Sequence, residues 1–272
     1  MTRISGISAN FEREPLVRPF GFKGGYMREI WQTVAGLESS SGIRACGINT
    51  QSVLWSDSGV FSSHLEASGN ALMFAMTEHA LQLCKGRSYE TPFELLDELL
   101  PQVWEYGKRI TGKDDLRLTF ALNALVGVDA AAWILYAREH GLKSFDDMLP
   151  AWCKDFLPCR HEQVASIPLM AYAIPMDEIV RHVDEGYFFL KVKIGSDPDG
   201  DGDPEKMLEW DKARISAIHK AIGNRETPYT ENGKIPYYFD ANGRYDTKER
   251  LMIFLDHCKA IGAFERIAVV EA

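Results

Sequence analysis

The sequence predicts an α+β domain followed by an α/β domain built on parallel strands. The N-terminal half carries a hairpin pattern and then three long helical stretches. From about residue 166 onward, short apolar runs alternate with segments long enough to form helices, which is the pattern of βαβ units. We therefore expect two domains, at residues 1–150 and 151–272.

The first domain is expected to combine a β-hairpin with helices. Residues 27–37 and 43–50 partly alternate apolar and polar side chains, and the turn-forming run Ser39–Gly42 separates them. Thr91-Pro92 provides an N-cap and a first helical residue for one of the helices that follow. The predicted helices span residues 62–84, 92–110 and 116–140. Their apolar faces are expected to pack on the hairpin.

The second domain is expected to alternate strands and helices. The predicted strands span residues 167–173, 187–194, 236–240 and 267–271. The predicted helices between them span residues 176–185, 204–222 and 247–262. Two polar inserts, at residues 195–203 and 223–234, are rich in Gly, Pro, Asp and Asn, which predicts surface loops.

Composition narrows the class of protein. The 272 residues include 30 basic and 39 acidic side chains, for a net charge of -9. This balance disfavours nucleic-acid partners and anionic membranes. No basic stretch precedes an apolar core at the N-terminus, and no unbroken apolar run approaches the roughly 18 residues of a membrane span. We expect a cytoplasmic protein without a membrane or nucleic-acid partner.

The cysteines predict neither a disulfide framework nor a zinc site. There are five of them, widely spaced and without a Cys-x-x-Cys pair. They are Cys46, Cys84, Cys153, Cys159 and Cys258.

Two lysines mark the second predicted strand. Lys191 and Lys193 are separated by one residue, so both side chains project from the same face of the sheet. On an enclosed face, two ammonium groups would repel each other unless an anion or carboxylates met them, and one pKa would fall toward that of a general base. The alternative is a strand whose lysines face solvent, and the lysine pair alone does not decide between the two.

Carboxylates end the next two predicted strands. Asp240 begins the run Asp-Ala-Asn-Gly, and the C-terminal end of a parallel strand is where α/β barrels place their active sites. The alternative is that this run is only a turn. Glu271 ends the apolar run that starts at Ile267. Two carboxylates suit Mg²⁺, whereas the scattered histidines form no transition-metal cluster.

The three strand ends together supply what metal-assisted enolisation needs. These needs are a base, a cationic contact for a substrate carboxylate, and a divalent ion for the developing negative charge.

These residues resemble motifs of the mandelate racemase and muconate lactonizing branch of the enolase superfamily. The resemblance rests on Lys191-Val192-Lys193, on Asp240-Ala241-Asn242 and on the run from Ala124 to Trp133, and it spans most of the chain. It implies an α+β capping domain followed by a (β/α)₇β barrel, which is a TIM-like barrel.

The resemblance also implies roles for individual residues. Lys193 would be the base, Lys191 would neutralise the substrate carboxylate, and Asp240 and Glu271 would be two of three ligands to Mg²⁺. Asn242 would support the ligands without binding the ion.

Two loops of the capping domain are expected to close over the substrate. They are Lys23–Tyr26 and Thr50–Ser56, with Tyr26, Trp55 and Ser56 as the expected contacts. The alternative for Tyr26 and Trp55 is ordinary packing within the cap.

The sequence departs from the family pattern in length. The segment between Lys193 and Asp240 is longer than the family's, and the two polar inserts account for the excess. Only about four of eight barrel strands precede Ala272. We therefore expect about the first half of the barrel, with the third metal ligand and the opposing acid or base beyond residue 272.

The expected reaction is removal of the proton next to a carboxylate. Racemisation or epimerisation is placed ahead of dehydration of an acid sugar, and cycloisomerisation is a third outcome. The expected partner is a small-molecule carboxylate, either an acid sugar or an amino-acid derivative, and the resemblance implies a homo-oligomer. A different possibility is a non-catalytic half-barrel that serves in binding or assembly.

Overall fold

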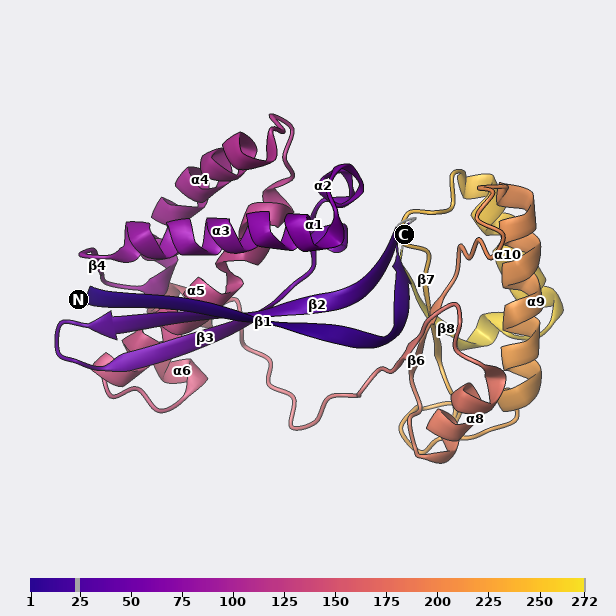
Figure 1. Cartoon of the computed structure of the whole chain (residues 1–272). Coiled ribbons are helices and arrows are strands. Elements are labelled where there is room, and N and C mark those ends of the chain that lie inside the picture. Colours follow the sequence, from indigo (N-terminus) through magenta and orange to yellow (C-terminus); the bar gives the residue numbers. More distant parts are fainter. Residues whose placement is uncertain (23–24, 272) are drawn as a thin grey trace. The chain divides into compact units, whose positions relative to one another are not determined.

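The chain divides into two compact units, each with its own sheet and helices (Figure 1). The computed structural model describes residues 1–22 and 25–271. Unit 1 comprises Met1–Arg160 and unit 2 comprises His161–Ala272. Residues 151–160, assigned to the second domain from the sequence, belong to unit 1.

Unit 1 contains a four-stranded antiparallel sheet in the order β3-β2-β1-β4. Its strands are β1 (Thr2–Phe22), β2 (Gly25–Ser39), β3 (Arg44–Gln51) and β4 (Ser88–Tyr89). The hairpin expected from the sequence is β2 with β3.

The strand β1 was not predicted from the sequence. Its segment holds Pro15 and Pro19, residues that normally demote a strand, and the β1–β2 register shifts between Pro15 and Phe20. This segment forms a strand because it pairs along almost the whole of β2. Such pairing between separate segments cannot be predicted from the local sequence.

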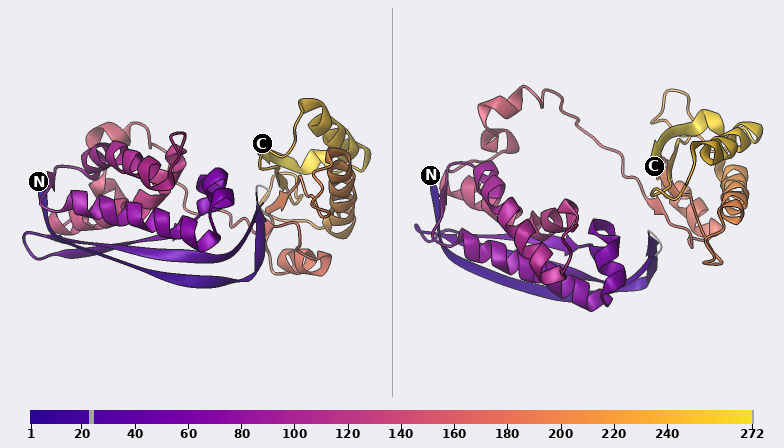
Figure 2. Two further views of the ribbon diagram at one scale, coloured as in Figure 1. Left: turned by 45° about the horizontal axis from the view of Figure 1, so that its top comes forward. Right: turned by 90° about the horizontal axis from the view of Figure 1, so that it is seen from above.

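Helices cover one face of the unit 1 sheet (Figure 2). The helices of unit 1 are α1 (Val53–Ser56), α2 (Ser58–Ser63), α3 (Glu66–Cys84), α4 (Pro92–Thr111), α5 (Leu118–Glu139), α6 (Phe145–Met148) and α7 (Ala151–Lys154), of which α3 and α5 pack directly on the sheet and α4 packs on these two. The long helices α3, α4 and α5 correspond to the three predicted ones. Inward side chains of the strands, such as Ile4, Ala35 and Leu37, join them in one apolar core.

The helix α5 is long and apolar enough to cross a membrane by length and composition. Half of its most apolar window is buried, however, and its side chains Ala124, Val128 and Ala131 lie in the core of unit 1. A core helix of a globular domain has this character.

Unit 2 contains a four-stranded parallel sheet in the order β5-β6-β7-β8. Its strands are β5 (Leu169–Met170), β6 (Leu190–Lys193), β7 (Tyr237–Asp240) and β8 (Ile267–Glu271). Its helices are α8 (Met176–Asp184), α9 (Pro204–Ile222) and α10 (Lys248–Ala260), with a short 3₁₀ turn, η1 (Phe264–Arg266). The alternation of strand and helix predicted from the sequence is therefore present.

Alternation along the unit 2 strands separates two faces of the sheet. Leu190, Val192, Tyr237 and Phe239 point to one face and form an apolar core with α8, α9 and α10, which all lie on that side (Figure 2). The intervening residues point to the opposite face.

Candidate functional site

The uncovered face of the unit 2 sheet carries a row of charged side chains. In the β6–β7 register Lys193 lies opposite Asp240, and in the β7–β8 register Asp240 lies opposite Glu271. These three residues end three neighbouring parallel strands, so the sheet itself brings them together.

A register shift places Glu271 in this row. Tyr237 pairs with Ile267, but Tyr238 pairs with Val269, so one residue of β8 is passed over between the two pairs. Without the shift, Asp240 would face Val270, and Glu271 would lie one position further along, pointing to the other face. Strand alternation in the sequence could not predict this bulge.

Lys191 links the two carboxylates. Its Nζ lies 2.8 Å from Asp240 Oδ2 and 2.6 Å from Glu271 Oε2. Lys193 Nζ lies 2.5 Å from the same Asp240 oxygen. Both lysines therefore meet carboxylates on one face of the sheet, and they are not a pair of solvated surface lysines.

The row runs from the protein interior toward solvent. Lys193 and Asp240 are 5% and 1% exposed, whereas the side chain of Glu271 is 45% exposed. Charge interactions strengthen where water is excluded, so the Lys193–Asp240 end is the more strongly coupled.

The two lysines differ in their tendency to hold a proton. Burial lowers the pKa of Lys193, and the nearby Asp240 opposes this effect without cancelling it. Burial also acts to lower the pKa of Lys191, but the hydrogen bonds from Asp240 and Glu271 outweigh it and raise that pKa. Paired groups whose pKa values are driven apart are suited to different chemical roles.

The carboxylates are held in their charged form. Burial acts to raise the pKa of Asp240, but Lys191 and Lys193 outweigh it and lower that pKa. Hydrogen bonds from Lys191 and Tyr238 lower the pKa of Glu271. Both groups thus present anionic oxygens on the uncovered face of the sheet.

Tyr238 belongs to the same cluster and was missed in the sequence analysis. Its hydroxyl donates to Glu271 Oε2 at 2.5 Å and lies 3.5 Å from Lys191 Nζ. That ammonium also lies 4.6 Å from the centre of the tyrosine ring, a cation–π distance. The available signal was its position two residues before Asp240, on the same face of the strand.

The run Asp-Ala-Asn-Gly, which starts at Asp240, is both a turn and part of the candidate site. Asn242 has a left-handed backbone with φ of 49°, and its amide donates to Asp240 Oδ1 at 3.0 Å, so the segment is a turn. This bond uses one oxygen of Asp240 and leaves Oδ2 to the lysines. The side-chain nitrogen of Asn242 is buried and has no hydrogen-bond partner among the described residues.

The expected substrate contacts from the cap lie in unit 1. Tyr26 and Trp55 are exposed. Ser56 is buried, and its hydroxyl donates to Asn123 Oδ1 at 3.2 Å, so this side chain already has a structural contact. Lys23 and Gly24, in the same predicted loop as Tyr26, lie outside the described residues. The role of these cap residues stays a prediction.

The donor set suits a divalent cation. The ammonium of Lys191 already lies between oxygens of Asp240 and Glu271, which shows that the two carboxylates converge on a single positive charge. Mg²⁺ is commonly held by one or two carboxylates, with water and substrate oxygens completing its coordination. Residues 1–22 and 25–271 contain no group of three or more His, Cys, Asp or Glu side chains placed to hold a metal.

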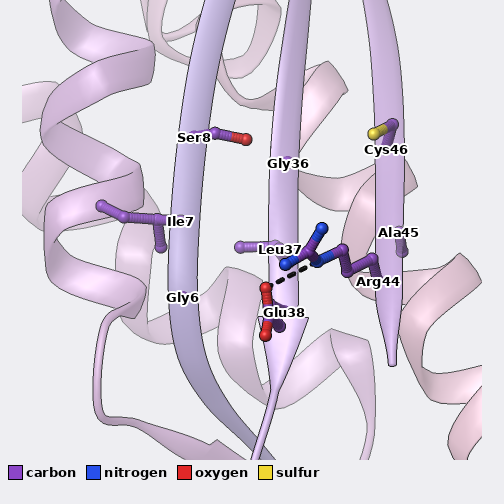
Figure 3. A pocket seen from close by; sticks show the side chains of 9 residues that line it. All are labelled: Gly6, Ile7, Ser8, Gly36, Leu37, Glu38, Arg44, Ala45 and Cys46. Atoms are coloured by element: carbon purple, nitrogen blue, oxygen red, sulfur yellow. Dashed lines mark hydrogen bonds and ion pairs between the residues drawn. The ribbon is translucent and has the colours of Figure 1, made fainter. Parts of the chain in front are cut away.

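A hollow lies on the uncovered face of the unit 1 sheet (Figure 3). It has a volume of about 310 Å³ and forms where Gly6 and Gly36 lack side chains. The one charged pair among its lining residues is Arg44 with Glu38, whose side chains are 79% and 36% exposed. Because no buried charged side chain is among its lining residues, this hollow is a weaker candidate for a reactive site than the unit 2 row.

Solved structures identify the fold. Over 98% of this chain, a dipeptide epimerase from Enterococcus faecalis V583 in complex with Mg and L-Leu-L-Tyr superposes with a TM-score of 0.61 at 17% identity. A mandelate racemase/muconate lactonizing enzyme-like protein from Rubrobacter xylanophilus also matches over 98% of the chain, with a TM-score of 0.61 at 18% identity. An L-talarate dehydratase from Polaromonas sp. JS666, in complex with Mg and L-glucarate, matches over 99% with a TM-score of 0.60 at 18% identity.

The chain shares the fold of these proteins. The fold class predicted from the sequence, an α+β capping unit followed by part of a β/α barrel, is thereby confirmed. The chain spans 60% of the length of the epimerase and of the Rubrobacter protein, and 61% of the dehydratase. No protein-family model and no curated protein matches this sequence.

Proposed function

We propose that this chain belongs to a Mg²⁺-dependent enzyme of the enolase superfamily that removes the proton next to a substrate carboxylate. The observation that carries the proposal is the aligned row of Lys193, Asp240 and Glu271 at three neighbouring strand ends, with Lys191 between the carboxylates. The shared fold with the Mg-bound epimerase and dehydratase supports it.

The proposed roles follow from position within the row. Lys193 is the buried lysine, so it is assigned the role of base, taking the proton onto Nζ. Lys191 lies nearer solvent and is assigned the role of holding the substrate carboxylate by charge. Tyr238 keeps Glu271 and Lys191 in place through its hydroxyl.

Asp240 and Glu271 would hold the ion. A bound Mg²⁺ would stabilise the negative charge that develops on the substrate carboxylate as the proton leaves. Asp240 is fixed for this task because one oxygen accepts the Asn242 amide while the other points into the row.

Within this class, we place epimerisation first and dehydration second. Both begin with the same proton removal, and they differ in whether a proton returns or a hydroxyl leaves. Dipeptide epimerases and acid-sugar dehydratases are both among the structural relatives, so dipeptides and acid sugars are the two substrate classes to test.

The experiment is proton exchange measured by ¹H NMR in D₂O. The full chain is incubated with Mg²⁺ and either L-Leu-L-Tyr or L-glucarate, and the signal of the proton next to the carboxylate is followed. Loss of that signal with one probe is expected. The rate of signal loss should be at least about 100-fold lower in Lys193→Ala, which is the lower end expected for removing a general base.

Metal binding is measured separately with Mn²⁺ as a paramagnetic substitute for Mg²⁺. Asp240→Asn and Glu271→Gln should each weaken Mn²⁺ binding, while Glu38→Gln in unit 1 should not. Binding that is equal in all three variants would contradict the metal assignment. Tight probe binding without any proton exchange would instead support the non-catalytic binding half-barrel.

A further inference from the structure

A buried carboxylate contacts the loops that follow β6 and β7. Asp211 is on α9, in the layer of helices that covers the apolar face of the sheet, and it is 1% exposed. A buried carboxylate in an apolar layer needs hydrogen-bond donors.

The donors to Asp211 come from the loops that follow two different strands. Oδ2 accepts the Gly195 amide at 2.6 Å, and Oδ1 accepts the Ser196 amide at 3.3 Å. These two residues follow β6. Oδ2 also accepts the Tyr245 hydroxyl at 2.9 Å, and Tyr245 lies in the loop after β7.

These loops begin at the proposed catalytic residues. Gly195 is two residues beyond Lys193, and the intervening Ile194 donates its amide to the Asp240 carbonyl at 3.0 Å. Gly195 has a φ of +79°, and an added Cβ would lie only 2.8 Å from Arg244 Cβ of the other loop. The two strand ends are therefore packed against each other, with Asp211 bonded to both.

A second side chain of α9 extends the same arrangement to β5. Arg214, three residues after Asp211, donates to the Ala171 carbonyl at 2.8 Å and to the Ile174 carbonyl at 3.3 Å. Both carbonyls belong to the segment that follows β5. One helix thus fixes the C-terminal ends of three of the four strands.

We propose that Asp211 is a positioning residue that holds the ends of β6 and β7 in the register that aligns Lys193 with Asp240. The inference rests on the proposed function only for the purpose of that alignment. The alignment itself is a property of the fold and can be measured without substrate or metal.

The geometry makes this positioning sensitive to pH. Burial raises the pKa of Asp211 to about 6, although the Gly195 amide, Tyr245 and Arg214 act to lower it. A protonated carboxyl has one acceptor oxygen fewer, and the two amides that face it cannot accept its proton. Proton uptake therefore breaks or weakens at least one of the three bonds.

Three other ionisable groups of the described residues interact with Asp211. They are Tyr245 from the loop after β7, Tyr172 from the segment after β5, and Arg214 on α9 itself. Burial raises the pKa of both tyrosines, so neither loses its proton near neutral pH. Asp211 is then the member of this group that titrates near pH 6.

The test is NMR of the full chain labelled with ¹³C and ¹⁵N, titrated from pH 5 to 8. In the wild type, the Gly195 and Ser196 amide signals should shift with a midpoint of about 6. In Asp211→Asn that titration should disappear, and at pH 7.5 the ε-CH₂ signal of Lys193 should move from its wild-type position. Glu209→Gln, an exposed site on the same helix, is the matched control and should change neither signal.

A milder variant keeps the test decisive if Asp211→Asn does not fold. Tyr245→Phe removes one donor and retains the ring, which lies 6.1 Å from the Phe254 ring. Because the tyrosine donor lowers the pKa of Asp211, the midpoint at Gly195 and Ser196 should rise in Tyr245→Phe. An unchanged midpoint would overturn the proposal, as would a folded Asp211→Asn with an unmoved Lys193 signal.

These outcomes are distinct from failure of the proposed function. If the NMR results are as expected but Mn²⁺ does not bind, the positioning role holds and the enzymatic role fails. If Mn²⁺ binds and proton exchange occurs but the Lys193 signal is unchanged in Asp211→Asn, the enzymatic role holds and the positioning role fails.

Discussion

The two units use the same layered plan but leave different faces uncovered. Each has a four-stranded sheet with helices packed on one side. The uncovered face in unit 1 presents glycines and the ion pair of Arg44 with Glu38 beside a hollow (Figure 3). The uncovered face in unit 2 presents lysines and carboxylates, of which Lys193 and Asp240 are buried.

The hollow in unit 1 lacks the buried charged side chains of the unit 2 face. What separates the faces is how strongly their charges interact, because coupling between charges grows as water is removed. In unit 1 the charged pair is screened by solvent, whereas in unit 2 it is held by strand register and by contacts from α9.

The largest difference is expected from removing one carboxylate on each face. Asp240→Ala should lower the free energy of unfolding of unit 2 by about 3–5 kcal/mol, because the buried ammonium of Lys193 loses the Asp240 carboxylate. Glu38→Ala in unit 1 should cost less than about 1 kcal/mol, since that pair is exposed. Urea unfolding followed by hydrogen exchange of β6–β7 and β2–β3 peptides measures both, and equal losses would remove the distinction.

The next effect concerns pH and sharpens the account of unit 2. The pKa of Asp211 is raised from 3.8 to about 6 in the fold, so the native state binds more protons than the unfolded state between these values. The stabilisation of the native state by protonated Asp211 is complete below pH 4 and is lost as pH rises through about 6. Between pH 4 and 7, the wild type should lose on the order of 3 kcal/mol more than Asp211→Asn.

Free energies of unfolding of the wild type and of Asp211→Asn, measured at several pH values, check this loss of stability. Glu209→Gln should follow the wild type across the whole range. If the free energy of unfolding changes with pH equally in the wild type and in Asp211→Asn, the pKa of the Asp211 carboxyl is not shifted by folding.

A smaller effect compares the two faces of the unit 1 sheet. A Cβ at Gly47 would lie 1.9 Å from the Gly127 carbonyl of α5, so Gly47→Ala should cost about 1–3 kcal/mol through overpacking. A Cβ at Gly36 would lie closest to the Ser8 hydroxyl, which can rotate away, and would make only ordinary contacts with the Cβ and the carbonyl of Ser8. Gly36→Ala should cost less than about 1 kcal/mol, and thermal unfolding of the two variants gives the ranking.

The sequence predicted the parts of the molecule that depend on local periodicity. The long helices, the β2–β3 hairpin and the parallel strands all follow from it, and so does the placement of Lys191 and Lys193 on one face. Asp240 and Glu271 could be placed at strand ends because apolar runs stop at carboxylates.

What the sequence did not predict depends on pairing between distant segments. The strand β1 exists through its register with β2, despite two prolines. The bulge that turns Glu271 toward Asp240 is a property of two strands together. Asp211 looked like an ordinary polar residue of a helix, because its donors come from loops 15 or more residues away.

The most direct test of the central claim is the position of a divalent ion in crystals grown with Mg²⁺. We predict an ion about 2.0–2.1 Å from a carboxylate oxygen of both Asp240 and Glu271, with the ammonium of Lys191 displaced from between them. Crystals grown in millimolar Mg²⁺ in which Lys191 still bridges the two carboxylates, with no ion bound to either, would contradict the account.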